Sequence, residues 1–312
     1  MQRFKFVLYR PIQLIPVLFG ISIITFVMIQ SIPGDPIRTL LGIKATPEAV
    51  ERVRAHYGLD EPIMVRYGYF LKNLVNGDMG RSLVYRAPVM EIVGERVGVT
   101  VFLLVYGVLL SLVLTVPLAI VASLYRGRPP DHAIRVFSTA GLGFPQFWLG
   151  IMLILVFSVW LKLFPVSGAG QTFVERLHHL FLPAFTIALA LSAVLTRNLR
   201  ASLLAEIESD YVAAARAKGL PGAWIFTRHV FRNSLIPTIN LLGVNIGWLI
   251  GGTVVIETVF SVPGLGWLLT QSIFARDYMT VQAVALAFAF ATVVVNFVVD
   301  VVTVALDPRI KM

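Results

Sequence analysis

The chain has 312 residues, of which 57% are hydrophobic and only 14% are charged, and its mean hydropathy is +0.81. Soluble globular domains average about 45–50% apolar and about 25% charged residues, so this composition excludes an ordinary soluble enzyme, a disordered regulator and a fibrous protein. The absence of cysteine excludes disulfides, thiol catalysis and thiolate metal sites. The net charge of +9 fits the basic inner loops of a membrane protein better than nucleic-acid binding.

Six apolar runs are long enough to be membrane spans, because an α-helix needs about 20 apolar residues to cross about 30 Å of hydrocarbon. The first run follows a basic N-terminal segment, 1–11, and is longer than the core of a signal peptide. The predicted spans are 12–32, 98–124, 134–161, 180–196, 238–259 and 280–306. The sequence therefore predicts an all-α polytopic membrane protein with six transmembrane helices, a five-helix core over 98–306 and a C-terminal tail over 307–312.

Basic residues predict the orientation, because they gather on the cytoplasmic side of membrane proteins. The segments assigned to the inside hold fourteen Lys and Arg residues, whereas the short outer loops hold three. The long segment 33–97 carries nine cations and eight acids, and long loops have little influence on topology. Both termini are therefore expected in the cytoplasm.

The extracytoplasmic segment 33–97 has the pattern of a folded chain. Apolar residues at a spacing of three to four between Ile63 and Leu74 predict an amphipathic helix that ends near Asn76-Gly77. Two roles remain open for this segment. It is either a docking surface for an outside partner or a lid over the outer helix ends.

The second hydrophilic segment, 197–236, contains the signals of a short helix with defined ends. Ser209 can cap a helix, and Asp210 would lie in its first turn, where a negative charge suits the helix dipole. Gly219 suits the position after the last helical residue, and Pro221 cannot continue the helix. These residues predict a short rigid helix over 210–219.

Two roles are open for the predicted helix 210–219. Seated in a groove of a soluble partner, it would transmit a conformational change into the membrane bundle, which a flexible loop would absorb. Alternatively, it would lie on the inner leaflet with Arg216 and Lys218 against anionic lipids.

The same segment resembles a known motif. Ala213-Ala214-Ala215, Gly219 and Leu235-Ile236-Pro237 are similar to the EAA loop of bacterial ABC importer permeases, which reads Glu-Ala-Ala, three residues, Gly and a later apolar-Pro ending. Ala213 replaces the glutamate, so a salt bridge used in other branches would be absent. Asp210-Tyr211 followed by 215–219 resembles the variant of the dipeptide/oligopeptide/nickel branch. Further stretches resemble that branch in order and spacing over essentially the full length: 33–36, 57–60, 77–82, 261–266, 277–278 and 308–310.

The resemblance implies the type I ABC importer permease fold and a multi-pass location in the bacterial inner (plasma) membrane. It implies a second homologous permease subunit, two ATPase subunits, an extracytoplasmic substrate-binding protein and membrane lipid as partners, and no nucleic acid. Peptides are the expected cargo, with nickel chelates, glutathione and oligosaccharides as alternatives. The residues expected to couple the chain to an ATPase are Asp210, Tyr211, Ala213, Ala214, Ala215, Arg216, Lys218 and Gly219.

Motifs for catalysis are missing from the chain. It contains neither a G-x-x-x-x-G-K-[ST] phosphate cradle nor an H-E-x-x-H metal motif. We therefore expect a transport subunit with no catalytic residue, no metal and no cofactor of its own, and ATP and Mg on the partner ATPases. A self-contained secondary transporter remains the alternative class, although the sequence has no clear internal repeat of the kind that such proteins often contain.

Ionisable residues within predicted spans are functional candidates by default. Glu257 lies near the outer end of its span, where it would recognise a substrate amine or hold a gate, or be satisfied by backbone N–H groups of the loop 261–266. Asn296 and Asp300 are one helical turn apart in the last span. They are candidates for the substrate pathway, and a structural polar bridge to a neighbouring helix is the alternative for Asp300.

Small residues predict two places of tight turns or close backbone approach. The first is an outer loop or gate formed by Pro263, Gly264 and Gly266. The second is a small-xxx-small ridge formed by Gly243, Gly247 and Gly251. This ridge would lie either at a subunit interface or against another helix of the same subunit.

Overall fold

The computed structural model describes residues 15–28, 46, 61–82 and 84–306. Within these ranges the regular elements are helices, and the only β-type pairing is an isolated bridge between Arg81 and Pro88. Predictions made for 1–14, 29–45, 47–60 and 307–312 lie outside the described residues. In chain order the helices are Ile15–Met28, α4 Ile63–Val75, α5 Val89–Leu124, α6 Pro129–Gly143, α7 Gln146–Leu153, η1 Ile154–Trp160, α8 Phe173–His179, α9 Phe181–Ile207, α10 Asp210–Ala217, α11 Gly222–Ile225, η2 Phe226–Phe231, α12 Arg232–Val259, α13 Leu265–Phe274 and α14 Tyr278–Leu306.

Within the described ranges, four helices are long and apolar enough to cross a membrane. They are α5, α9, the continuous helix Gly222–Val259 that unites α11, η2 and α12, and the stretch Tyr278–Val299 of α14. A bent pair, α6 with α7 and η1, makes a fifth if it is counted as one span. The shorter apolar helix Ile15–Met28 lies within the predicted first span 12–32, whose ends are outside the described residues.

Two of the long helices extend beyond the apolar runs from which spans were predicted. α5 begins at Val89, nine residues before the predicted start at 98. α9 continues to Ile207, and the next long helix already begins at Gly222. The predicted loop 197–236 is therefore reduced to a short connection that contains α10. The helices continue because the faces that they turn toward the bundle remain apolar and buried beyond the uncharged runs.

The predicted third span, 134–161, is a broken helix. α6 ends at Gly143, α7 begins at Gln146, and the two directions differ by 108°. The cause is Pro145, which lacks a backbone N–H and forces the preceding residue, Phe144, out of the helical region. Phe144 accordingly has an extended backbone with φ −91° and ψ 130°.

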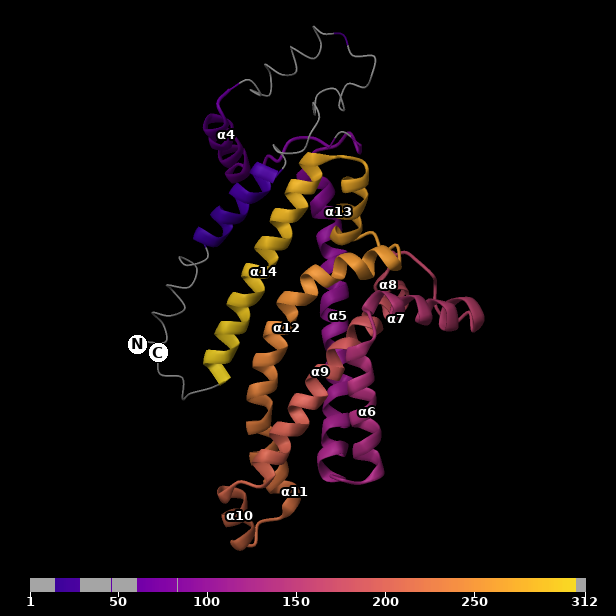
Figure 1. Cartoon of the computed structure of the whole chain (residues 1–312), viewed down its shortest axis with the longest axis vertical. Helices are drawn as coiled ribbons and strands as arrows, with labels where there is room; N and C mark the ends of the chain where they lie inside the picture. Colours follow the sequence, from indigo (N-terminus) through magenta and orange to yellow (C-terminus); the bar gives the residue numbers. More distant parts are fainter. Residues whose placement is uncertain (1–14, 29–45, 47–60, 83, 307–312) are drawn as a thin grey trace.

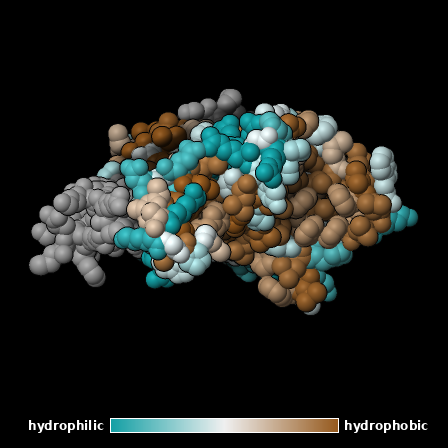
Figure 2. All heavy atoms as spheres, turned by 90° about the horizontal axis from the view of Figure 1, so that it is seen from below, coloured by the Kyte–Doolittle hydropathy of each residue, from teal (hydrophilic) through white to brown (hydrophobic). Residues whose placement is uncertain are grey.

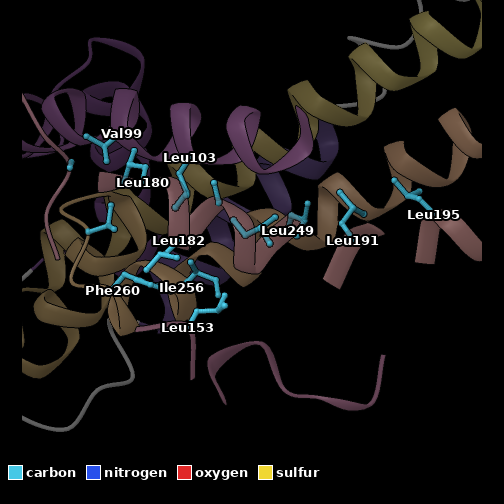
Figure 3. Packing of buried hydrophobic residues seen from close by; sticks show 14 residues of the cluster. Val99, Leu103, Leu153, Leu180, Leu182, Leu191, Leu195, Leu249, Ile256 and Phe260 are labelled. Carbon is cyan, nitrogen blue, oxygen red and sulfur yellow. The ribbon is translucent and has the colours of Figure 1, made fainter. Parts of the chain in front are cut away.

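The core lies where α5, α9 and α12 meet (Figure 1). Leu103 of α5, Leu182 of α9 and Ile256 of α12 are at most 1% exposed and point into one cluster (Figure 3). Gly107 permits the close approach of α5 and α9, since a Cβ there would lie 2.9 Å from the Ile187 side chain. This packed centre connects the two ends of the molecule rigidly.

The two ends of the bundle have different structures. At one end, α4 lies beside the helix Ile15–Met28 and the segment after α4 lies beside α13 and the start of α14, and at the other end α10 and α11 form the tip (Figure 1). α4 is the predicted amphipathic helix, and Tyr67 packs it against Phe26 of helix Ile15–Met28. Viewed from the α10 end, hydrophobic residues cover much of one flank and hydrophilic residues gather nearer the centre (Figure 2).

Candidate functional site

Helix α10 has the predicted position and a well-defined end. The backbone N–H of Gly219 donates to Arg216 O, and that of Leu220 donates to Ala215 O, at 2.9 and 3.3 Å. This pair of bonds is the Schellman motif, which requires a left-handed residue after the helix. Gly219 supplies it with φ +76°. At the other end the predicted cap is wrong in detail, because the Ser209 hydroxyl donates backwards to Glu206 O at 2.6 Å and makes no cap hydrogen bond.

One face of α10 is anchored and the other is free. Val212 is 1% exposed and packs in a cluster with residues of α9, α11 and η2. Ala213, Ala214, Arg216 and Lys218 are exposed on the remaining surface. The anchored face fixes α10 to the long helices, and the free face is smooth and basic. Such a helix can contact a soluble protein and move together with the bundle.

Tyr211 adds a polar connection between α10 and the long helices, which no pattern in the sequence indicates. Its hydroxyl donates to the Glu206 carboxylate at the end of α9 and accepts from Asn233 Nδ2 in α12 at 3.2 Å. Partial burial raises the pKa of the phenol, and the hydrogen bond to Glu206 raises it further. The hydroxyl therefore stays protonated and ties α10 to both neighbouring long helices.

A buried ion pair near the same end joins α6 to α9. Arg200 donates through Nε and Nη2 to the two carboxylate oxygens of Asp131, at 2.7 and 2.8 Å. Asp131 is 1% exposed, and it also accepts from the backbone N–H of Gly127 at 2.9 Å. The partners are 69 residues apart in sequence, so no local pattern predicts the pair. It fixes the start of α6, the first half of the broken span, to the central helix α9.

Glu257 is buried at the opposite end and its partners are protein groups. Its Oε1 accepts from the Thr100 hydroxyl at 2.7 Å, and its Oε2 accepts from the backbone N–H groups of Gly266 and Trp267 at 2.6 and 3.1 Å. Thr100 in turn accepts from Leu265 N at 2.8 Å. Of the two predicted roles, these contacts match satisfaction by the following loop. The carboxylate also suits the N-terminus of α13 electrostatically.

The predicted tight turn after α12 surrounds this carboxylate. Gly264 lies against the carboxylate, since a Cβ there would be 2.4 Å from Glu257 Oε1. Gly266 lies against the backbone of α12, since a Cβ there would be 2.4 Å from Val254 Cα. Pro263 lies in the same turn, between α12 and α13. The three predicted loop residues and Glu257 therefore form one packed unit, while their role as a gate remains a prediction.

The glycine ridge on α12 serves two different surfaces. A Cβ on Gly243 would lie 2.1 Å from the Val299 side chain of α14, so this part packs within the chain. Gly247 and Gly251 instead line an open groove of about 420 Å³ together with Asn296, Val244, Trp248 and Thr292. Asn296 thus borders open space, as a pathway residue must. The side chain of Asp300 lies outside the described residues.

A second buried polar group, at the end that holds Glu257, fastens the segment between α4 and α5 to the bundle. Asp277, which is 0% exposed, accepts from the Ser82 hydroxyl and from the Thr280 hydroxyl, the latter at 2.8 Å. Ser82 and Asp277 belong to two of the stretches that carry the family resemblance, but they are 195 residues apart. Their contact holds the segment before α5 against the start of α14.

The predicted residues therefore occupy three places. The α10 residues lie at one end, Glu257 and the loop glycines lie at the other, and Asn296 borders the groove between α12 and α14. Among the described residues, no group of three or more His, Cys, Asp or Glu side chains is arranged to hold a metal ion. This arrangement separates the exposed helix α10 from the groove and from the end that holds Glu257, which is the plan of a membrane permease.

Comparisons with known proteins agree with this class. The model of the family "binding-protein-dependent transport system inner membrane component" matches residues 115–312, and the model of the corresponding N-terminal region matches 3–104. The chain therefore belongs to this family and is an inner-membrane, multi-pass permease subunit of an ABC importer, of the dipeptide/oligopeptide/nickel type.

Similar proteins extend over nearly the whole chain. The glutathione transport system permease proteins GsiC of Escherichia coli (strain K12) and of Shigella dysenteriae serotype 1 are 37% identical over 307 residues, which is 98% of this chain and 99% of each relative. Among solved structures, the MetNI methionine ABC transporter matches with a TM-score of 0.57 and 16% identity over 70% of this chain and 97% of its own. An amino acid ABC transporter with histidines gives 0.55 and 14%, over 68% and 93%. These similarities support the type I importer permease fold.

Proposed function

We propose that this chain forms half of the translocation pathway of an ATP-driven importer and is coupled to an ATPase subunit through α10. The observation that carries the proposal is the structure of α10 itself, a capped helix with Val212 buried in the bundle and an exposed basic face. A push on the exposed face reaches α9 and α12 through packed side chains and through the Tyr211 hydrogen bonds.

The proposed partners follow from the family. They are a second homologous permease, two ATPase subunits that bind ATP and Mg, and a binding protein that delivers the cargo from outside. The chain itself is proposed to bind no cofactor. We propose that both termini and α10 lie in the cytoplasm, and the excess of cations in the segments assigned to that side supports this orientation. We place the pathway along the α12–α14 groove beside Asn296, at the contact with the second permease.

The proposed cargo is a small peptide. The relatives that are 37% identical over almost their full length are glutathione permeases by name, and glutathione is itself a tripeptide. We therefore expect short peptides to be transported, with glutathione as the first compound to test. Within the chain, Glu257 is assigned to anchoring α13, because its oxygens already accept three hydrogen bonds.

The experiment is uptake into proteoliposomes that contain both permeases, the ATPases and the binding protein encoded beside this chain. Labelled glutathione and labelled dipeptides are supplied outside, with ATP inside. We expect uptake that requires ATP and the binding protein and that is absent without the ATPases. Uptake by this chain alone under an ion gradient would contradict the proposal and favour a secondary transporter.

A further inference from the structure

Beside α10 lies a second exposed surface, centred on a residue between Gly219 and Leu235 that is not one of the defining positions of the family motif. Trp224 of α11 is 45% exposed, although a tryptophan indole is among the most apolar surfaces a protein has. Its ring packs edge-on against His229 at 5.0 Å, and His229 packs against Tyr211 of α10 at 6.2 Å. Tyr211, His229 and Trp224 therefore form a continuous row, called here the aromatic row, that runs from α10 through η2 to α11 at the start of the continuous helix Gly222–Val259.

The aromatic row lies too far along its helix to be an ordinary membrane anchor. Trp224 precedes Thr238, where the apolar run of the same continuous helix begins, by 14 residues. At 1.5 Å per residue this distance is about 21 Å. The headgroup layer on each side of the hydrocarbon is about 5–8 Å thick. If the apolar run begins at the edge of the hydrocarbon, Trp224 of α11 projects into the cytosol, and α11 lies beside α10 at the tip seen in Figure 1.

Charge around the aromatic row indicates what binds it. Arg228 lies one helical turn after Trp224 and is exposed, and Arg216 and Lys218 of α10 are exposed as well. The single acid between residues 210 and 228 is Asp210, and Glu206, at the Tyr211 end of the row, is occupied by the Tyr211 hydroxyl. An apolar ring within a basic border is complementary to an apolar pocket with a carboxylate rim. Exposed tryptophan and arginine held in place by their neighbours are also the residues that dominate protein–protein binding energies.

We propose that Trp224 is a principal anchor of the ATPase contact and inserts into an apolar, acid-rimmed pocket of the ATPase beside the α10 groove. The inference rests on the proposed coupling through α10 and extends it to a second contact point. Because the aromatic row joins Trp224 to Tyr211, the two contact points move as one body. Two separated attachments resist rotation of the permease on the ATPase, which a single helix in a groove does not.

The test compares Trp224→Ala, Trp224→Phe and the control Trp160→Ala in nanodiscs that contain both permeases. Trp160 is 75% exposed in η1, far from α10. The dissociation constant of the ATPase should rise at least ~10-fold for Trp224→Ala, as for an interface anchor. It should change little for Trp224→Phe, which keeps a ring, and for Trp160→Ala. Wild-type ATPase affinity in Trp224→Ala, with the complex intact, overturns the inference.

A fluorescently labelled variant tests the inference even if Trp224→Ala disturbs the fold. The natural chain has no cysteine, so a fluorophore on Trp224→Cys reports one position. Its emission should shift when the ATPase is added and should not be quenched by brominated phospholipids. Quenching by the lipids without a response to the ATPase would place Trp224 on the membrane and refute the inference.

Failure of this inference is distinguishable from failure of the proposed function. If Ala214→Cys cross-links to the ATPase while Trp224→Ala binds it normally, the second contact is wrong and coupling through α10 stands. If Ala214→Cys gives no cross-link in an active complex, the coupling proposal itself is wrong.

Discussion

Replacement of Gly219 by valine tests the geometry at the end of α10. The residue has φ +76°, and nothing lies within 4 Å of where a Cβ would be. Steric crowding therefore plays no part, and the cost arises from the backbone alone. A residue other than glycine in the left-handed region costs about 1–2 kcal/mol, which corresponds to a factor of about 5–30 in the equilibrium constant between the closed and the open turn.

The assay measures ATP hydrolysis and peptide uptake in parallel in the reconstituted complex. If a closed α10 is required to transmit the stroke, uptake should fall in Gly219→Val, by at most about 5–30-fold, while hydrolysis continues. Gly219→Asn should be milder, because asparagine tolerates the left-handed conformation. Gly222→Val is the matched control, since that glycine has no positive φ and no atom within 4 Å of a Cβ. Equal losses in Gly219→Val, Gly219→Asn and Gly222→Val would refute the reasoning.

Three further variants test the contacts that hold the bundle together, each by thermal unfolding in detergent. Thr100→Val removes the hydroxyl that Glu257 needs and should cost about 1–3 kcal/mol; an unchanged transition would contradict the buried network. Asp131→Asn breaks a buried pair and should cost about 3 kcal/mol, whereas Glu208→Gln, in an exposed pair, should cost at most about 1 kcal/mol; equal effects would contradict the burial argument. Gly266→Ala should destabilise by about 1–3 kcal/mol through overpacking.

Gly251→Ala is the matched control for the glycine variant. A Cβ at Gly251 meets nothing within 4 Å, whereas one at Gly266 meets Val254 Cα at 2.4 Å. The control should therefore leave the transition in place. Helix propensity favours alanine over glycine, so a loss of stability in Gly251→Ala as large as that in Gly266→Ala would contradict the assignment of the cost to the close approach at Gly266.

Local signals made α10 predictable. A first-turn acid, a run of strong helix formers and a glycine fitted for a left-handed position all act within about ten residues, and the observed helix Asp210–Ala217 lies within the predicted 210–219. The Gly219 turn has the predicted form. Ser209 differs because its hydroxyl had a competing acceptor in the preceding turn, Glu206 O, and a sequence pattern cannot rank such alternatives.

Long-range contacts were not predictable from the sequence. Thr100 and Glu257 are 157 residues apart, and Asp131 and Arg200 are 69 apart; neither spacing is periodic. The bend at Pro145 could have been anticipated from the proline rule, but the high apolarity of 134–161 dominated the prediction of one straight span. Helix ends were misplaced for a related reason, because hydropathy locates the bilayer and helices such as α5 continue beyond it.

The central claim is that α10 transmits motion from an ATPase, and single-cysteine cross-linking tests it most directly. The natural chain is free of cysteine, so Ala214→Cys on the exposed face can be paired with cysteines in the ATPase groove of an otherwise native complex. We predict a cross-link whose yield changes between the ATP-bound and nucleotide-free states, and loss of uptake once it forms. An Ala214→Cys complex that transports peptide normally and never cross-links would contradict the account.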